Sequence, residues 1–163
     1  MPARRFVVPD IHGCARTFSA LLEKVLNLRP ADTLFLLGDY TDRGPRSKEV
    51  VDRIMDLRKN GQAVHTLRGN HDDMLVRSCG NPEYLRVWLL NGGGTTLASF
   101  GVEDPCEIPA AYRSFFARLP FFLELDDFIL VHAGLNLQAP DPFADTEAML
   151  WSRSSNADLH RTR

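Results

Sequence analysis

The sequence has few cysteines, no excess of basic residues and no long apolar run, and each absence narrows the possible functions. Its three cysteines, Cys14, Cys79 and Cys106, are far apart and form no Cys-x-x-Cys pair. This spacing indicates neither a disulfide framework nor a thiolate zinc site and is typical of a reducing compartment. Lysine and arginine number 19 against 21 acidic residues, which argues against a nucleic-acid partner. Because no segment approaches the roughly 20 apolar residues of a membrane span, we expect a cytoplasmic protein with no membrane partner. Its oligomeric state is left open.

The sequence does contain a repeated arrangement in which a short apolar run is followed at once by polar residues. Four segments share it: FVVPDIH at 6–12, TLFLLGDYTDRG at 33–44, AVHTLRGNHDD at 63–73 and FILVHAG at 128–134. Such runs predict buried strands. Amphipathic segments at 18–28 and 47–61 predict helices between the first three strands. The alternation predicts an α/β fold, a layered β-sheet flanked by helices with parallel neighbouring strands.

The middle of the chain has a different pattern. Residues 81–120 contain two amphipathic stretches and predict a helical insert, about 73–120, that caps the sheet. Residues 121–132 read as two strands around Asp126-Asp127 and predict a hairpin. The segment Gly92–Gly94 lacks the Lys-Ser/Thr of a P-loop, so we expect a flexible connection there.

The polar residues that follow the four apolar runs are either charged or able to hold metal ions. Because the carboxyl ends of parallel strands meet at one rim of a sheet, we expect these residues to converge. They are Asp10, His12, Asp39, Asp42, Arg43, Asn70, His71, Asp72 and His132. Carboxylate and imidazole ligands suit Mn, Fe or Zn and are typical of two-metal hydrolytic sites. An aspartate on a tight turn, as Asp39 is after Gly38, can bridge two cations about 3.5–4 Å apart. Asp72 and Asp73 we interpret as favouring the start of a helix through its dipole.

Four motifs in register resemble a known family. They are Asp-Ile-His-Gly at 10–13, Gly-Asp-Tyr-Thr-Asp-Arg-Gly at 38–44, Gly-Asn-His-Asp at 69–72 and His-Ala-Gly at 132–134. Their order and spacing resemble the phosphoprotein phosphatase branch of the calcineurin-like metallophosphoesterases. That branch includes protein serine/threonine phosphatases and symmetrical dinucleoside tetraphosphatases. The phage and bacterial members are the most similar, because Asn91-Gly92-Gly93 and Leu150–Arg153 also resemble theirs.

The resemblance implies a role for each matching residue. The implied metal ligands, with Asp39 shared between two divalent cations, are Asp10, His12, Asp39, Asn70 and His132. His71, which by its chemistry alone could also be a ligand, is implied to be the general acid. Asp42 would orient His71, and Arg43 and Arg153 would bind the substrate phosphate. An arginine after a tryptophan could also simply pack on the ring, so Arg153 has a second interpretation.

The implied activity is hydrolysis of a phosphomonoester by in-line attack of a hydroxide that bridges the metals, with Mn²⁺ the first choice of cation. Our first expectation for the substrate is phosphoserine or phosphothreonine in a protein. The alternatives are a small phosphorylated substrate, namely a dinucleoside tetraphosphate cleaved symmetrically, and an inactive phosphate-binding or regulatory relative.

The C-terminal end departs from the family pattern. The resemblance implies a Gly-His-Thr segment that completes the second metal site, and the 163 residues contain none. We therefore expect residues 1–163 to be a single domain that is incomplete at its C-terminus. His160 we interpret as a solvated residue rather than a replacement ligand.

Overall fold

A three-stranded parallel sheet forms the centre of the computed structural model, which describes residues 2–153. The strands are β1 (Arg5–Val8), β2 (Thr33–Leu36) and β3 (Ala63–Thr66), in the order β1-β2-β3. Val8 lies opposite Leu36, and Leu36 lies opposite Thr66. The strands therefore end level with one another, and the loops that follow them leave from the same edge of the sheet.

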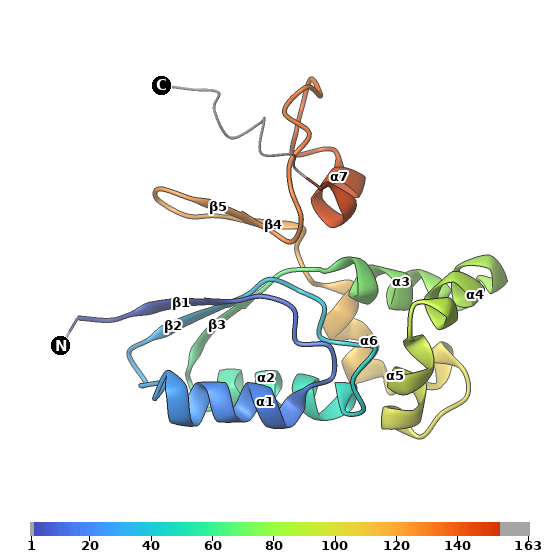
Figure 1. The fold of residues 1–163 in the computed structure, drawn as a ribbon, viewed down its shortest axis with the longest axis horizontal. Coiled ribbons are helices and arrows are strands. Elements are labelled where there is room, and N and C mark those ends of the chain that lie inside the picture. Colours follow the sequence, from blue (N-terminus) through green and yellow to red (C-terminus); the bar gives the residue numbers. More distant parts are fainter. Residues whose placement is uncertain (1, 154–163) are drawn as a thin grey trace.

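Helices cover one face of this sheet (Figure 1). They are α1 (Ala15–Ala20), which continues into the π-helical turn η1 (Leu21–Val25), and α2 (Ser47–Lys59). Leu34 and Leu36 of β2 are fully buried, as are Val50 and Ile54 of α2. The predicted strands and the α2 helix are confirmed, and the expected helix over 18–28 begins earlier and ends earlier.

The predicted helical insert lies beyond the carboxyl edge of the sheet (Figure 1). Its elements are α3 (Asn70–Ser78), α4 (Pro82–Leu90), α5 (Gly93–Phe100), the 3-10 turn η2 (Pro105–Glu107) and α6 (Ala110–Ala117). Asn81 caps α4 by accepting hydrogen bonds from the backbone N–H groups of Glu83 and Tyr84. The expectation that no disulfide forms is wrong, because Cys79 and Cys106 are bonded across 27 residues, with Cα atoms 5.0 Å apart. That contact depends on the path of the insert, which residue spacing does not reveal.

The predicted hairpin forms a second sheet on the side of the first sheet opposite α1 and α2 (Figure 1). Strands β4 (Phe122–Glu124) and β5 (Ile129–Val131) pair antiparallel, with Asp126 and Asp127 between them. The final described helix, α7 (Thr146–Trp151), is tied to the segment after β5 by a hydrogen bond from Ala133 N–H to the Met149 carbonyl. The fourth apolar run therefore belongs to a different sheet from the first three. None of the helices in residues 2–153 is long and apolar enough to cross a membrane.

Candidate metal centre

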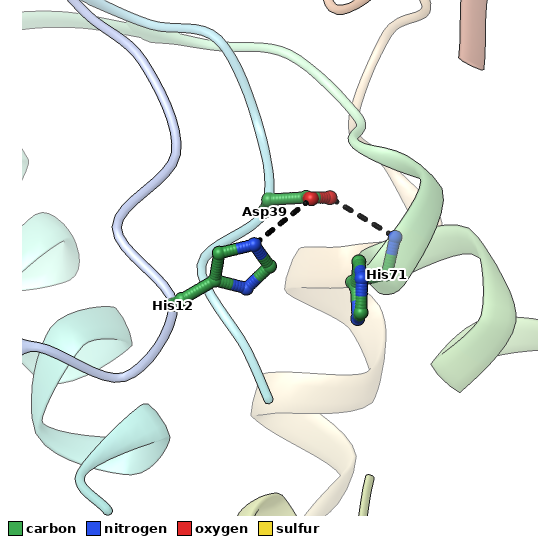
Figure 2. Close-up of side chains that lie close together, drawn as sticks. All are labelled: His12, Asp39 and His71. Atoms are coloured by element: carbon green, nitrogen blue, oxygen red, sulfur yellow. Dashed lines mark hydrogen bonds and ion pairs between the residues drawn. The ribbon is translucent and has the colours of Figure 1, made fainter. Parts of the chain in front are cut away.

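The candidate site forms where the loops after β1 and β2 are joined by backbone hydrogen bonds. The N–H groups of Ile11 and His12 both donate to the Asp39 carbonyl, at 3.1 and 2.8 Å. One residue further along, Gly13 N–H donates to the Tyr40 carbonyl at 3.0 Å. These bonds fix the two loops side by side, so the side chains of His12 and Asp39 face the same space, as Figure 2 shows.

The backbone at the site is in a conformation that L-residues rarely adopt. His12, Asp39, Asp42 and Arg43 have φ values of 44°, 53°, 68° and 64°. In the described chain they are four of the five non-glycine residues with positive φ. Left-handed backbone costs roughly 1–2 kcal/mol per residue and persists only where surrounding contacts enforce it. Strain at four candidate site residues therefore singles out these loops as the place where the fold supports function.

Two glycines allow the loops after β2 and β3 to touch. A Cβ atom added to Gly38 would lie 2.3 Å from the backbone nitrogen of Gly69, and one added to Gly69 would lie 2.1 Å from Oδ1 of Asp39. Both distances are too short for any side chain. The close approach lets the N–H of His71, in the first turn of α3, donate to Asp39 Oδ1 at 3.0 Å (Figure 2).

Asp39 lies between two groups of possible cation ligands. Its Oδ2 is 3.4 Å from His12 Nε2, and its Oδ1 is 3.7 Å from His132 Nε2. Ligand atoms of Asp10, Asp39 and His132 lie within 4.8 Å of one another, as do those of His12, Asp39 and His71. The expected ligands are thus brought together with Asp39 in common. Asp10 lies close to both histidines, with its Oδ2 3.9 Å from His12 Nε2 and its Oδ1 4.0 Å from His132 Nδ1.

The hydrogen bonds of the two histidines fit a metal site. His12 Nδ1 and His132 Nδ1 each lie 2.8 Å from a backbone carbonyl, that of Thr41 and that of Leu37 respectively. A carbonyl can only accept, so each Nδ1 carries the proton and each Nε2 has a free lone pair, the arrangement typical of metal-binding imidazoles.

Both Nε2 atoms lack a donor that would satisfy them. His12 Nε2 is buried without a hydrogen-bond partner among the described residues. His132 Nε2 faces the Asn70 side-chain oxygen at 3.0 Å, which places two acceptors against each other. Acceptors that converge without a proton between them match a site for a cation, and carboxylate, imidazole and amide donors suit the harder divalent metals. The residues present therefore fit the metal site that the sequence predicts.

His71, Asp42 and Arg43 form a separate arrangement beside this site. His71 Nδ1 lies 2.7 Å from Asp42 Oδ2, and both side chains are almost fully buried. Arg43 Nη2 lies 3.1 Å from His71 Nε2. Because a guanidinium only donates, Nε2 is the acceptor and the proton of the neutral ring is on Nδ1, directed at Asp42. The predicted pairing of Asp42 with His71 is present, and Arg43 is adjacent to it.

Asp72 has a role that the sequence analysis missed. Its carboxylate accepts hydrogen bonds from the backbone N–H groups of Asp39, Tyr40 and Gly69, at 2.8, 3.1 and 3.0 Å. These hydrogen bonds hold the strained turn on which Asp39 lies. Asp72 therefore does more than favour the start of α3, in whose first turn it lies. Burial, with a smaller contribution from the charge of Asp39, raises the pKa of Asp72 well above its ordinary value. The position three residues after Gly69 was the available signal for a capping residue.

Arg153 is not part of this cluster. It is exposed, two residues after the end of α7, and its side chain makes no hydrogen bond or ion pair with residues 2–153. Its predicted phosphate-binding role therefore rests on the motif alone. His160 lies outside the described residues.

Comparison with known proteins agrees with this fold. The calcineurin-like phosphoesterase family model matches residues 3–161, so the chain belongs to the calcineurin-like metallophosphoesterases. The asymmetrical bis(5'-nucleosyl)-tetraphosphatase PrpE of Geobacillus thermodenitrificans is 31% identical over 144 residues, which cover 79% of this chain and 56% of that protein. The symmetrical bis(5'-nucleosyl)-tetraphosphatase of Vibrio parahaemolyticus is 31% identical over 134 residues, which cover 82% and 45%. The chain therefore spans about half the length of the curated relatives it matches.

A solved structure gives the same fold. A protein serine/threonine phosphatase from Saccharomyces cerevisiae matches 93% of this chain and 52% of that one, with a TM-score of 0.58 and 21% identity. At this identity the likeness shows the fold alone. The predicted family and fold class are confirmed, and the enzyme names of the sequence relatives correspond to the alternative substrate class rather than to the first one.

Proposed function

We propose that this chain provides the catalytic site of a dinucleoside polyphosphate hydrolase that uses two divalent cations, with Mn²⁺ the first choice. The observation that carries the proposal is the position of Asp39, a buried carboxylate whose two oxygens face His12 and His132 separately. The choice of substrate is supported by relatives of both kinds, asymmetrical and symmetrical, that are named for dinucleoside tetraphosphates.

The cation ligands in this proposal are Asp10, His12, Asp39, Asn70 and His132. When bound, two cations neutralise charge on the phosphoryl oxygens and lower the pKa of a water molecule toward neutrality. The backbone carbonyls of Thr41 and Leu37 hold the two imidazoles with Nε2 directed at the site. Asp72 holds the turn that carries Asp39 in place.

His71 is the proton donor to the leaving oxygen in this proposal. Asp42 accepts a hydrogen bond from the Nδ1–H group of His71, which leaves Nε2 as the atom that can deliver a proton to the leaving oxygen. In this structure Arg43 donates a hydrogen bond to His71 Nε2. While Nε2 accepts this bond, it cannot carry the proton that the leaving oxygen needs. Binding of an anionic phosphoryl group would draw the guanidinium onto the phosphoryl oxygens and free Nε2. Arg43 therefore couples phosphate binding to the protonation of the acid.

The second candidate is a protein serine/threonine phosphatase, because the motifs at 38–44 and 69–72 resemble those of that class as well. The metal site and His71 would act in the same way on either substrate. The choice between the two substrates rests on the surfaces around the insert.

The test compares substrates with the chain loaded with Mn²⁺. We expect diadenosine tetraphosphate to be hydrolysed with a higher kcat/KM than a phosphoserine peptide, and EDTA to abolish both activities. Chromatography of the products then distinguishes two ADP, the symmetrical outcome, from ATP with AMP, the asymmetrical one. Preference for the phosphopeptide would replace the proposed substrate with the second candidate. Absence of hydrolysis with any divalent metal, p-nitrophenyl phosphate included, would favour an inactive phosphate-binding relative.

A further inference from the structure

The carboxylate of Asp42 is held by two side chains of the helical insert that no motif assigns to the site. Trp88 Nε1–H donates to both of its oxygens, at 3.0 Å to Oδ1 and 2.8 Å to Oδ2. The Thr96 hydroxyl donates to Oδ1 at 2.7 Å. Both residues are fully buried, as is Asp42. A buried carboxylate with fixed donors on both oxygens has one orientation available to it.

Thr96 holds Asp42 at two places at once. Its Oγ1 also accepts the backbone N–H of Asp42 at 2.9 Å, so one hydroxyl fixes both the strained backbone and the carboxylate. Ser47 lies 3.1 Å from the same hydroxyl. Because the Thr96 hydroxyl donates its hydrogen bond to Asp42, its Oγ1 can only accept a hydrogen bond from the Ser47 hydroxyl. These bonds compensate for the left-handed conformation of Asp42, whose φ is 68°.

The glycine segment Gly92–Gly94 lies between Trp88 and Thr96, and its conformation depends on the packing against Trp88. The expectation of a flexible connection at Gly92–Gly94 is wrong, because Gly93 and Gly94 form the first turn of α5. A Cβ atom on Gly93 would lie 2.4 Å from the indole ring of Trp88, whereas one on Gly94 would meet nothing within 4 Å. Gly93 therefore lets α5 begin directly against the indole, and this brings Trp88 and Thr96 to the same carboxylate.

We infer that Trp88 and Thr96 are positioning residues for the proposed acid, acting through Asp42 to hold His71 with its Nε2 toward the leaving oxygen. The inference rests on the role proposed for His71 and does not depend on which phosphate ester is the substrate. A carboxylate deprived of these donors can turn away from His71, and the imidazole then loses its fixed orientation. The resulting fall in the rate of hydrolysis should be largest for substrates whose leaving group must be protonated.

The test uses two matched pairs of variants. Thr96→Val removes the hydroxyl at nearly constant volume, and Thr96→Ser restores it. Gly93→Ala places a methyl group into the indole of Trp88, and Gly94→Ala places one into open space on the same helical turn. Thermal unfolding of each variant establishes that it is folded, and measured metal content establishes that the cation ligands are unaffected.

The kinetic measurement compares two aryl phosphates under Mn²⁺ loading. Phenyl phosphate has a poor leaving group, and p-nitrophenyl phosphate has a good one that needs little protonation. We expect kcat for phenyl phosphate to fall about 10- to 100-fold in Thr96→Val, and kcat for p-nitrophenyl phosphate to fall less than about threefold. Thr96→Ser should recover most of the loss, and Gly93→Ala should resemble Thr96→Val while Gly94→Ala resembles the unaltered chain. Equal slowing of both esters in Thr96→Val, or no slowing of either, would overturn the inference.

A second measurement needs no turnover and so separates this inference from the proposed function. The chain has two tryptophans, so the indole N–H of Trp88 can be assigned in ¹H–¹⁵N spectra, using Trp151→Phe. In Thr96→Val we expect the Trp88 indole resonance to shift and the Nδ1 proton of His71 to exchange faster with water, with both restored in Thr96→Ser. If the chain hydrolyses no ester, the proposed function fails and these spectra decide alone. Unchanged exchange of the His71 proton in Thr96→Val would then overturn the positioning role.

Discussion

At the residue scale, the site depends on which atom of each histidine is free. His12 and His132 use Nδ1 to donate to backbone carbonyls and leave Nε2 for a cation. His71 uses Nδ1 to donate to a carboxylate. An imidazole that donates to a carboxylate is better placed to serve in proton transfer than one that donates to a neutral backbone carbonyl. The hydrogen-bond partners of the three histidines thus fit the two roles proposed for them, cation ligand and proton donor.

This difference predicts distinct consequences of two substitutions. Asp39→Asn should lose bound Mn²⁺ and nearly all hydrolysis, because the charged carboxylate that faces both groups of cation ligands becomes an uncharged amide. His71→Asn should keep its metal content and slow the hydrolysis of phenyl phosphate by about 10²- to 10⁴-fold, the usual contribution of a general acid. Elemental analysis and steady-state kinetics measure both effects.

His65→Asn is the matched control for the second substitution. His65 stacks on Phe35 within the sheet, with ring centroids 5.0 Å apart, and makes no contact with the candidate site, so neither metal content nor kinetics should change. Equal loss of metal in Asp39→Asn and His71→Asn would instead make His71 a ligand.

At the scale of secondary-structure elements, an ion pair joins the start of β1 to the start of β2. The Arg4 guanidinium donates to Asp32 Oδ1 and Oδ2, at 3.1 and 2.5 Å, and the Arg29 N–H donates to the same carboxylate at 2.9 Å. The Arg4 hydrogen bond lowers the pKa of Asp32 far below its ordinary value. This pair lies at the amino ends of the strands, away from the candidate site. It therefore contributes to the stability of the sheet and not to the candidate site.

The lowered pKa predicts a pH-dependent contribution to stability. Stability from Asp32 is present above its unfolded pKa of about 3.9 and is lost as the pH falls through the lower folded pKa. Asp32→Asn should therefore lower the Tm at pH 7, and the difference should narrow as the pH falls below about 4. Calorimetry across this range measures it.

A control with the same change of charge is available on the hairpin. Asp126 pairs with Arg5 at 3.6 Å, and its side chain is 85% exposed. Exposed ion pairs contribute little, so Asp126→Asn should leave the Tm unchanged at both pH values. A Tm difference for Asp32→Asn that stays constant from pH 7 to pH 3 would contradict the assigned cause.

The elements also show how far sequence reasoning can reach. Apolar runs and helical periodicity predicted β1, β2, β3, α2, the insert and the hairpin, because each pattern reflects burial of one local face. The same reasoning placed β5 in the first sheet, whereas it pairs only with β4 among the described strands. Strand pairing depends on contacts between distant residues, and no local pattern records them. For the same reason the Cys79–Cys106 bond was missed.

The candidate site was predictable to the extent that motifs mark it. Asp10, His12, Asp39, Asn70 and His132 were identified from polar residues after apolar runs and do converge. The support of Asp42 by Trp88 and Thr96 was not identified, because 46 and 54 residues separate these donors from it. A tryptophan and a threonine in a helical insert look like ordinary core residues until the fold is known.

At the scale of the whole molecule, the site is assembled from two sheets and the insert. Asp10, Asp39 and Asn70 follow strands of the parallel sheet, and His132 follows the hairpin. Asp42 is held from α4 and α5. Movement of the hairpin relative to the sheet would therefore alter the ligands of one cation before those of the other, since His132 is the hairpin's contribution and His12 belongs to the sheet.

The central claim is that Asp39 is shared by two cations. Anomalous X-ray diffraction from crystals soaked in Mn²⁺ tests it directly. We expect two peaks per chain about 3.5–4 Å apart, one on each side of the Asp39 carboxylate, with His71 Nε2 outside the coordination distance of both. A single peak, or a peak ligated by His71, would contradict this account.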